Sequence, residues 1–155
     1  MKNFGIVTLL FFMAAGILSR GQDRDVNAGI RDSLIGAWRL AWLEEPDAQG
    51  TVHTADCTGL LVYTRDGHMS VQVMYRTPQA SSGTAPVRYA QGGYEASFGR
   101  YEIDDAHTFT FHVEGALVRT LIGKDLKRVF ELSGSQLIVK SPDPNEHWRV
   151  AWERY

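Results

Sequence analysis

One arginine stands where a charged side chain could do chemistry. Residues 127–132 have the pattern of a strand, and residues two apart on a strand share a face, so Arg128 shares a face with Phe130 and Leu132. An arginine that points into an apolar interior needs an acceptor, because an unpaired buried charge costs several kcal/mol. A ligand carboxylate held by the guanidinium would be one acceptor, and an internal acid such as Glu102 would be another.

Aromatic side chains on other strands could line the same interior. Tyr63 and Tyr101 lie in strand-like segments from which a phenol could reach a cavity, although such tyrosines more commonly pack in the core with the hydroxyl satisfied. Phe111 lies on the apolar face of its own segment. The candidate ligand-binding residues are therefore Arg128, Tyr63, Tyr101, Phe111 and Phe130.

The remaining reactive groups do not form a recognisable catalytic or metal-binding pattern. His107 and His112 alternate with phenylalanines and are expected to face solvent, and no two histidines have the H-x-H or H-x-x-x-H spacing of metal ligands. Cys57 is the only cysteine, so no internal disulfide can form. We therefore predict no catalytic residue, no metal ligand and no cofactor.

The N-terminus has the layout of a secretory signal peptide. Lys2 precedes a mostly apolar run from Phe4 to Leu18, and Ser19-Arg20-Gly21 has the small-x-small pattern of a signal-peptide cleavage site. The run is shorter than the ~20 apolar residues of a spanning helix, which disfavours the alternative of a membrane anchor. We expect residues 1–21 to be cleaved near Gly21, residues 22–26 to be a linker and residues 27–155 to be one exported domain, either periplasmic or secreted and free of the membrane after cleavage.

Composition narrows the possible partners. The 155-residue chain is 44% apolar and 22% charged, as in a globular protein, and its net charge is −2. Cleavage at Gly21 would remove two basic residues and no acidic one, and no cluster of Lys and Arg is present. Nucleic acid is therefore not an expected partner, because phosphate contacts need clustered basic side chains.

The two most aromatic segments lie at opposite ends of the predicted domain. Trp38, Leu40 and Trp42 would share a face of one strand, and a second stripe near the C-terminus holds the other two tryptophans: Trp148, Val150, Trp152 and Arg154. Because the first and last strands both have such aromatic faces, we predict that they pair with each other and close the sheet. An all-β, eight-stranded antiparallel up-and-down barrel follows, with strands near residues 37–45, 59–63, 68–76, 94–103, 108–114, 127–132, 136–140 and 147–154.

Other segments are expected to close or border this barrel. A short helix over residues 28–35, capped by Asn27 and ended by Gly36, would close one end. Residues 51–58 are ambiguous between strand and loop. The connection over residues 77–93 is longer than the ~12–15 residues usual for an irregular loop, and it is expected to be a lid or a disordered segment.

Several motifs resemble those of lipocalin-like domains. Gly36-Ala-Trp38 is similar to the lipocalin G-x-W signature, and Arg154 resembles the arginine that crosses that tryptophan. Further matching pieces run in order from Leu34 to Arg154, although this chain has Phe111-His112 where the family often has two histidines. The resemblance implies a lipocalin-like barrel closed by Gly36, Trp38 and Arg154, with a cavity for one small hydrophobic molecule.

Three functions fit this interpretation. The first is an exported protein that binds a small, mostly apolar and possibly carboxylate-bearing ligand inside the barrel. The second is an isomerase, cyclase or hydrolase that uses the same cavity. The third is a structural or partner-binding barrel whose interior is filled by its own aromatic side chains.

Overall fold

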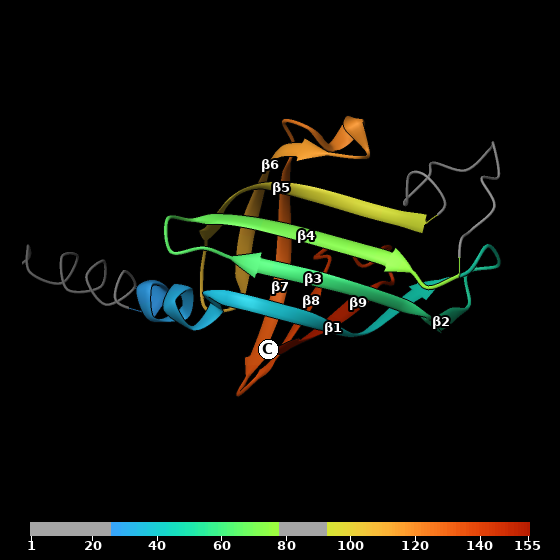
Figure 1. The fold of residues 1–155 in the computed structure, drawn as a ribbon, viewed down its shortest axis with the longest axis horizontal. Helices are drawn as coiled ribbons and strands as arrows, with labels where there is room; N and C mark the ends of the chain where they lie inside the picture. The colour runs from blue at the N-terminus through green and yellow to red at the C-terminus, as the bar shows by residue number, and fades with distance from the viewer. Residues whose placement is uncertain (1–25, 78–92) are drawn as a thin grey trace, which may run out of the picture.

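The computed structural model describes residues 26–77 and 93–155, which form a closed antiparallel barrel (Figure 1). Neighbouring strands pair in the order β2-β1-β3-β4-β5-β6-β7-β8-β9, and β9 pairs back with β1. The predicted signal peptide, the linker up to residue 25, and residues 78–92 of the long connection lie outside the described residues. The strands are β1 (Gly36–Pro46), β2 (Val52–Ala55), β3 (Cys57–Tyr63), β4 (His68–Tyr75), β5 (Tyr94–Ile103), β6 (Thr108–Ala116), β7 (Asp125–Ser133), β8 (Gln136–Lys140) and β9 (Arg149–Arg154).

The predicted eight-stranded up-and-down barrel is confirmed, and β2 is an additional short strand. It falls within residues 51–58, where the sequence was ambiguous. Both β2 and β3 pair with the same side of β1, since β3 faces residues 36–39 and β2 faces residues 43–46. The register shifts by one residue between these two pairings, so β2 continues the line of β3 and the barrel wall still has eight strands.

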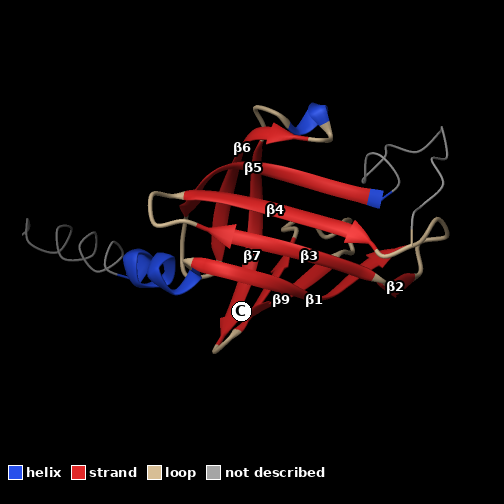
Figure 2. Ribbon diagram, viewed as in Figure 1, coloured by secondary structure: helices blue, strands red, loops and turns tan. Residues whose placement is uncertain are grey.

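The two ends of the barrel differ, as Figure 2 shows. Helical residues 26–34 lie at the end where β1 begins, together with the β3–β4 and β7–β8 turns, and we call this the closed end. The opposite end, called the open end, holds the β8–β9 connection (residues 141–148) and the points where β4 ends and β5 begins. No helix among the described residues has the length and apolarity needed to cross a membrane.

Two details of the closed end differ from the prediction. Asn27 is not a cap, because it lies within the helical residues and its Nδ2 donates a hydrogen bond to the Ile103 carbonyl at 3.3 Å. The helical residues reach back to residue 26, and Gly36 is the first residue of β1 with a φ of 131°. This positive φ lets the chain turn sharply from the helix into the strand.

The predicted stripe of Trp38, Leu40 and Trp42 is wrong at its last member. The register of β1 against β9 shifts between Leu40 and Trp42, and such a bulge moves the following side chains to the opposite face. Leu43 is therefore buried in the core, whereas Trp42 is only partly buried and lies 5.2 Å from the Arg149 guanidinium. A one-residue bulge cannot be read from the alternation of residue types alone.

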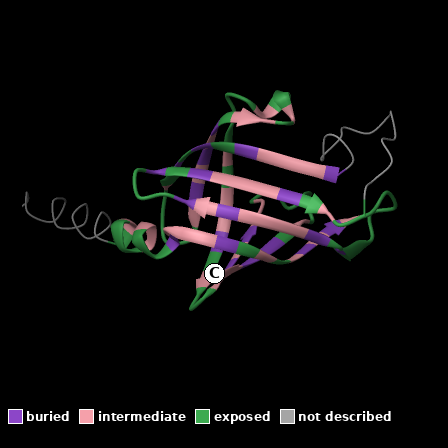
Figure 3. Cartoon of the chain, viewed as in Figure 1, coloured by how far each residue is buried: buried purple, intermediate pink, exposed green. Residues whose placement is uncertain are grey.

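The closed half of the barrel is filled by side chains, and Figure 3 shows buried positions alternating with less buried ones along the strands. Tyr63 makes edge-to-face contacts with Tyr101 and Phe109, with ring centroids 4.9 and 6.1 Å apart. Most of the largest fully buried side chains come from strand ends at the closed end or from the adjoining helix: Trp38, Trp152, Tyr63, Phe109, Leu34, Leu61 and Leu137. This half of the interior is core.

Candidate functional site

Arg128 lies on the inner face of β7, in phase with the buried Phe130. Its guanidinium lies 5.2 Å from the centre of the Trp148 ring, and its Nη1 donates a hydrogen bond to the Lys127 carbonyl at 2.9 Å. Burial lowers the pKa of Arg128, while the negative charges of Glu146 and Glu95 act in the opposite direction. A guanidinium keeps its proton over the whole ordinary pH range, so Arg128 remains charged at neutral pH.

Glu102, the example given for an internal acid beside Arg128, is not its partner, and the acids whose charges act on Arg128 are Glu146 and Glu95. Glu102 is exposed on the outer face of β5, where its carboxylate lies 3.8 Å from His112 Nε2. The Nδ1 atom of the same histidine lies 2.7 Å from Asp125. His112 thus bridges two carboxylates on the outer surface, which agrees with the expectation that it faces away from the interior.

The two predicted phenols pack against each other in the closed half of the barrel, with ring centroids 4.9 Å apart. Tyr63 is 1% exposed, and its hydroxyl has no hydrogen-bond partner among the described residues. Burial and then the neighbouring Tyr101 phenol raise the pKa of the Tyr63 phenol, and the charge of Arg128 acts in the opposite direction. Tyr101 belongs to the closed end, because its hydroxyl donates to the Thr64 carbonyl at 3.3 Å and Arg31 lies over its ring.

The two phenylalanines belong to the apolar wall. Phe111 and Phe130 are 4% and 2% exposed, on the inner faces of β6 and β7. The Phe130 ring lies 6.0 Å from that of Phe109. Of the five predicted ligand-binding residues, Tyr63 and Tyr101 thus pack together in the closed half, Phe111 and Phe130 are buried on neighbouring strands, and Arg128 lies opposite Phe109 in the β6–β7 ladder.

The sequence interpretation missed several polar residues on the inner face of the open half. Ser97 is buried, and Glu95 precedes it by two residues on β5, in phase with Tyr101. Strict alternation back from Tyr101 would have found both. Glu45 is also buried, but it reaches the inner face only because of the bulge in β1, so no sequence signal could have found it.

Cys57 lies at the same end of the barrel. It is buried at the start of β3, and burial together with the charge of Glu45 raises the pKa of its thiol to about 11. A thiol in this state is a weak nucleophile at neutral pH. Among residues 26–77 and 93–155, no three His, Cys, Asp or Glu side chains are grouped so that they could hold a metal ion.

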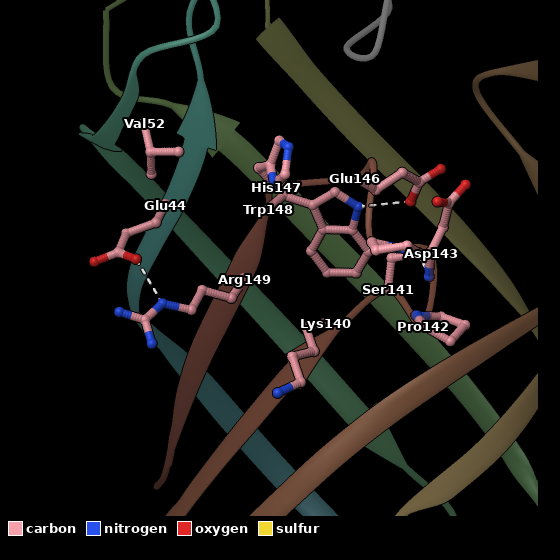
Figure 4. A pocket seen from close by; sticks show the side chains of 11 residues that line it. Glu44, Val52, Lys140, Ser141, Pro142, Asp143, Glu146, His147, Trp148 and Arg149 are labelled. Atoms are coloured by element: carbon pink, nitrogen blue, oxygen red, sulfur yellow. Dashed lines mark hydrogen bonds and ion pairs between the residues drawn. The ribbon is translucent and has the colours of Figure 1, made fainter.

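Two hollows lie at opposite ends of the molecule. One, of about 400 Å³, lies at the open end between the β8–β9 connection and the end of β1, and Figure 4 shows Trp148 among its lining side chains. The other, of about 440 Å³, lies at the closed end between the helix and the barrel, where Arg31 and Tyr101 contribute to its wall. Of these two hollows, only the one at the open end is lined by a residue in contact with Arg128, namely Trp148.

Comparison with known proteins places the barrel in a family. A crystal structure of an uncharacterized protein from Bacteroides eggerthii DSM 20697 is similar at 14% identity and a TM-score of 0.47, over 79% of this chain and 99% of that one. A redesigned β barrel is similar at 11% identity and a TM-score of 0.44, over 81% of this chain and 94% of that one. The comparison with curated proteins gives no match. The family model of the lipocalin-like domain matches residues 35–154, which include every strand of the barrel, and the chain therefore belongs to the lipocalin-like domain family.

Proposed function

We propose that this protein binds a small, mostly apolar molecule with a carboxylate group in the open half of the barrel, where Arg128 holds the carboxylate. The observation that carries the proposal is the setting of Arg128 on the inner face of β7. A guanidinium has five N–H donors, and the hydrogen bond to the Lys127 carbonyl uses one of them. A carboxylate that accepts two parallel hydrogen bonds would match the remaining donors.

The apolar part of the ligand would account for most of the affinity. Phe111 and Phe130 present buried apolar surface near Arg128, and a ligand gains about 25 cal/mol for each Å² of apolar surface it removes from water. Membership of a lipocalin-like family supports a small molecule as the partner. Because Trp148 contacts Arg128 and also lines the hollow at the open end, we place the ligand toward that end.

A fluorescent fatty acid tests the proposal directly. cis-Parinaric acid is slender and carries a carboxylate, and its methyl ester has the same chain without the charge. We expect the acid to bind the unmodified protein more tightly than the ester, and Arg128→Met to weaken binding of the acid about tenfold or more, because a charge-assisted hydrogen bond contributes about 1.5–3 kcal/mol. Equal binding of acid and ester by the unmodified protein would contradict the proposal.

Lys127→Met is the matched control for this substitution. Lys127 neighbours Arg128 on β7 but points outward, where its side chain is 56% exposed and lies 3.8 Å from Asp104. Its replacement removes the same charge from the same strand without touching the interior. The fluorescence titration should therefore give the unmodified affinity for Lys127→Met, and an equal loss in both variants would show that Arg128 acts only through the overall charge.

Export is a second part of the proposal. The N-terminal motif of a basic residue, an apolar run and a small-residue exit supports cleavage after Gly21. Intact-mass measurement of the protein from the exported fraction of its own host should give a chain that begins at Gln22. A chain that retains residues 1–21 would contradict export with cleavage. Native mass spectrometry of the same sample would also detect a small molecule that co-purifies with the protein.

An enzyme that uses the same cavity is the second candidate. It is favoured by two carboxylic acids, Glu45 and Glu95, on the inner face of the open half that also holds Arg128. The two functions differ in the fate of the co-purifying molecule. A binding protein returns it unchanged after incubation, whereas an enzyme converts it and loses this conversion in Glu95→Gln while still binding the molecule.

A further inference from the structure

Trp148 contacts both the interior of the barrel and its surface at the open end. On one side it packs against the hydrophobic core, and its ring lies 5.2 Å from the Arg128 guanidinium. On the other side it lines the open-end hollow of about 400 Å³, together with His147 and Glu146 (Figure 4). A single indole therefore lies between the proposed ligand anchor and a hollow at the surface.

The backbone around Trp148 is not part of the sheet. The preceding turn is fixed by Asp143, which accepts hydrogen bonds from the backbone N–H groups of Asn145 and Glu146. Pairing between β8 and β9 begins only with Lys140 and Arg149. Residues 147 and 148 thus lie between a fixed turn and a fixed ladder, in a position where small backbone rotations can redirect the side chain.

The contacts that hold the indole in place are individually modest. Its Nε1 donates a hydrogen bond to Glu146 at 3.0 Å, and the stacking with Arg128 is a cation–π contact. Each such contact is weak at a partly exposed position, because solvent competes with it. Displacement of the ring would therefore cost little compared with displacement of Trp38 or Trp152, both of which are buried.

We propose that Trp148 is a movable partition and that a ligand reaches Arg128 from the open-end hollow by displacing its indole ring. This inference rests on the proposed function, because it requires that Arg128 holds a carboxylate. Displacement of the ring exposes the guanidinium to the hollow, so an elongated acid can enter with its carboxylate first. The Nε1 hydrogen bond to Glu146 holds the partition in its closed position.

Stopped-flow binding of cis-parinaric acid to three variants tests the inference. Trp148→Ala removes the partition, so association and dissociation should both become about tenfold faster while the equilibrium affinity stays within about threefold. Trp148→Phe keeps a ring but has no Nε1 donor, and it should accelerate both rates by a smaller factor. The phenylalanine variant also provides a fold-preserving test if the alanine variant is poorly folded.

Trp42→Ala is the matched control, since Trp42 also lies 5.2 Å from an arginine, Arg149, but on the outer face. Its rates should equal those of the unmodified protein. If acid binds better than ester but the Trp148 variants have unmodified rates, or lose affinity with unchanged association, the partition is wrong and the binding function stands. If the unmodified protein does not prefer the acid, the proposed function and the partition are both wrong.

Discussion

The two ends of the barrel each pair an arginine with a tryptophan, but the pairs have different surroundings. At the closed end, the Arg154 guanidinium lies 4.2 Å from the Trp38 ring and donates to the carbonyls of Ser33 and Ile35 at 2.5 and 2.8 Å. Trp38 is fully buried, and its Nε1 donates to the Leu34 carbonyl at 2.8 Å. This arginine ties the helix, β1 and β9 into one unit.

At the open end, Arg128 stacks on Trp148 without such a set of backbone acceptors. Its hydrogen bond within the described residues goes to the carbonyl of its own neighbour, Lys127, which fixes no other element. The tryptophan is only partly buried and borders a hollow. The same pair of residue types therefore has a structural role where backbone carbonyls of another element accept hydrogen bonds from the guanidinium. Where they do not, the pair is a candidate binding site.

Removal of the closed-end tryptophan should have the largest effect on stability. Trp38→Ala deletes a fully buried indole and its hydrogen bond to the helix, which should lower the free energy of unfolding by about 4 kcal/mol. Trp148→Ala should lower it by no more than about 1 kcal/mol, because that ring is partly exposed. Guanidinium denaturation of both variants measures the difference, and equal losses would remove the distinction between the two ends.

The two arginines should respond in opposite ways to the same substitution. Arg154→Met leaves two carbonyls at the end of the helix without their donor and should cost about 2–3 kcal/mol of unfolding free energy. Arg128→Met replaces a partly desolvated charge by an apolar side chain of similar length and should be neutral or slightly stabilising. Thermal unfolding of the two variants checks this, and a large loss in Arg128→Met would identify Arg128 as a structural residue.

The sequence predicted the closed end better than the open end, for a physical reason. Meeting of the first and last strands follows from their aromatic faces, and strict alternation on β4 places Met69, Val71 and Val73 on one inner face, as the structure has them. The open end depends on a bulge in β1 and on an irregular connection before β9. Local alternation specifies neither feature, so the inward Glu45, the outward Trp42 and the contact of Trp148 with Arg128 were not foreseen.

Two glycines, one at each end of the barrel, distinguish the cost of backbone strain from the cost of a clash with Arg154. Gly36 has a φ of 131°, and a Cβ atom there would lie 2.9 Å from Arg154 Nη1, whereas Gly50 in the β1–β2 turn has a φ of 83° and open space around it. Gly50→Ala should therefore cost about 1 kcal/mol for conformation alone. Gly36→Ala should cost about 1–3 kcal/mol because the guanidinium must also shift. If both variants lose the same free energy of unfolding in chemical denaturation, the Arg154 side chain can move away from residue 36 without cost. Arg154 would then not hold the helix against β1 and β9.

Acidification should weaken the outer surface of the open end by a small amount. Glu44 accepts a hydrogen bond from Arg149 Nε at 2.5 Å, which lowers the pKa of the Glu44 carboxyl below its ordinary value of 4.5. A group whose pKa is lower in the folded state stabilises that state above its unfolded pKa, and this contribution is lost as the pH falls through the folded value.

Glu44→Gln removes this contribution. The difference in melting temperature between the unmodified protein and the variant should be constant above pH 4.5 and should shrink as the pH falls below it. High salt should reduce the difference at every pH, because the pair is exposed and screened. A difference that persists at low pH would mean that Glu44 acts through the packing of its side chain against β9 and not through its charge.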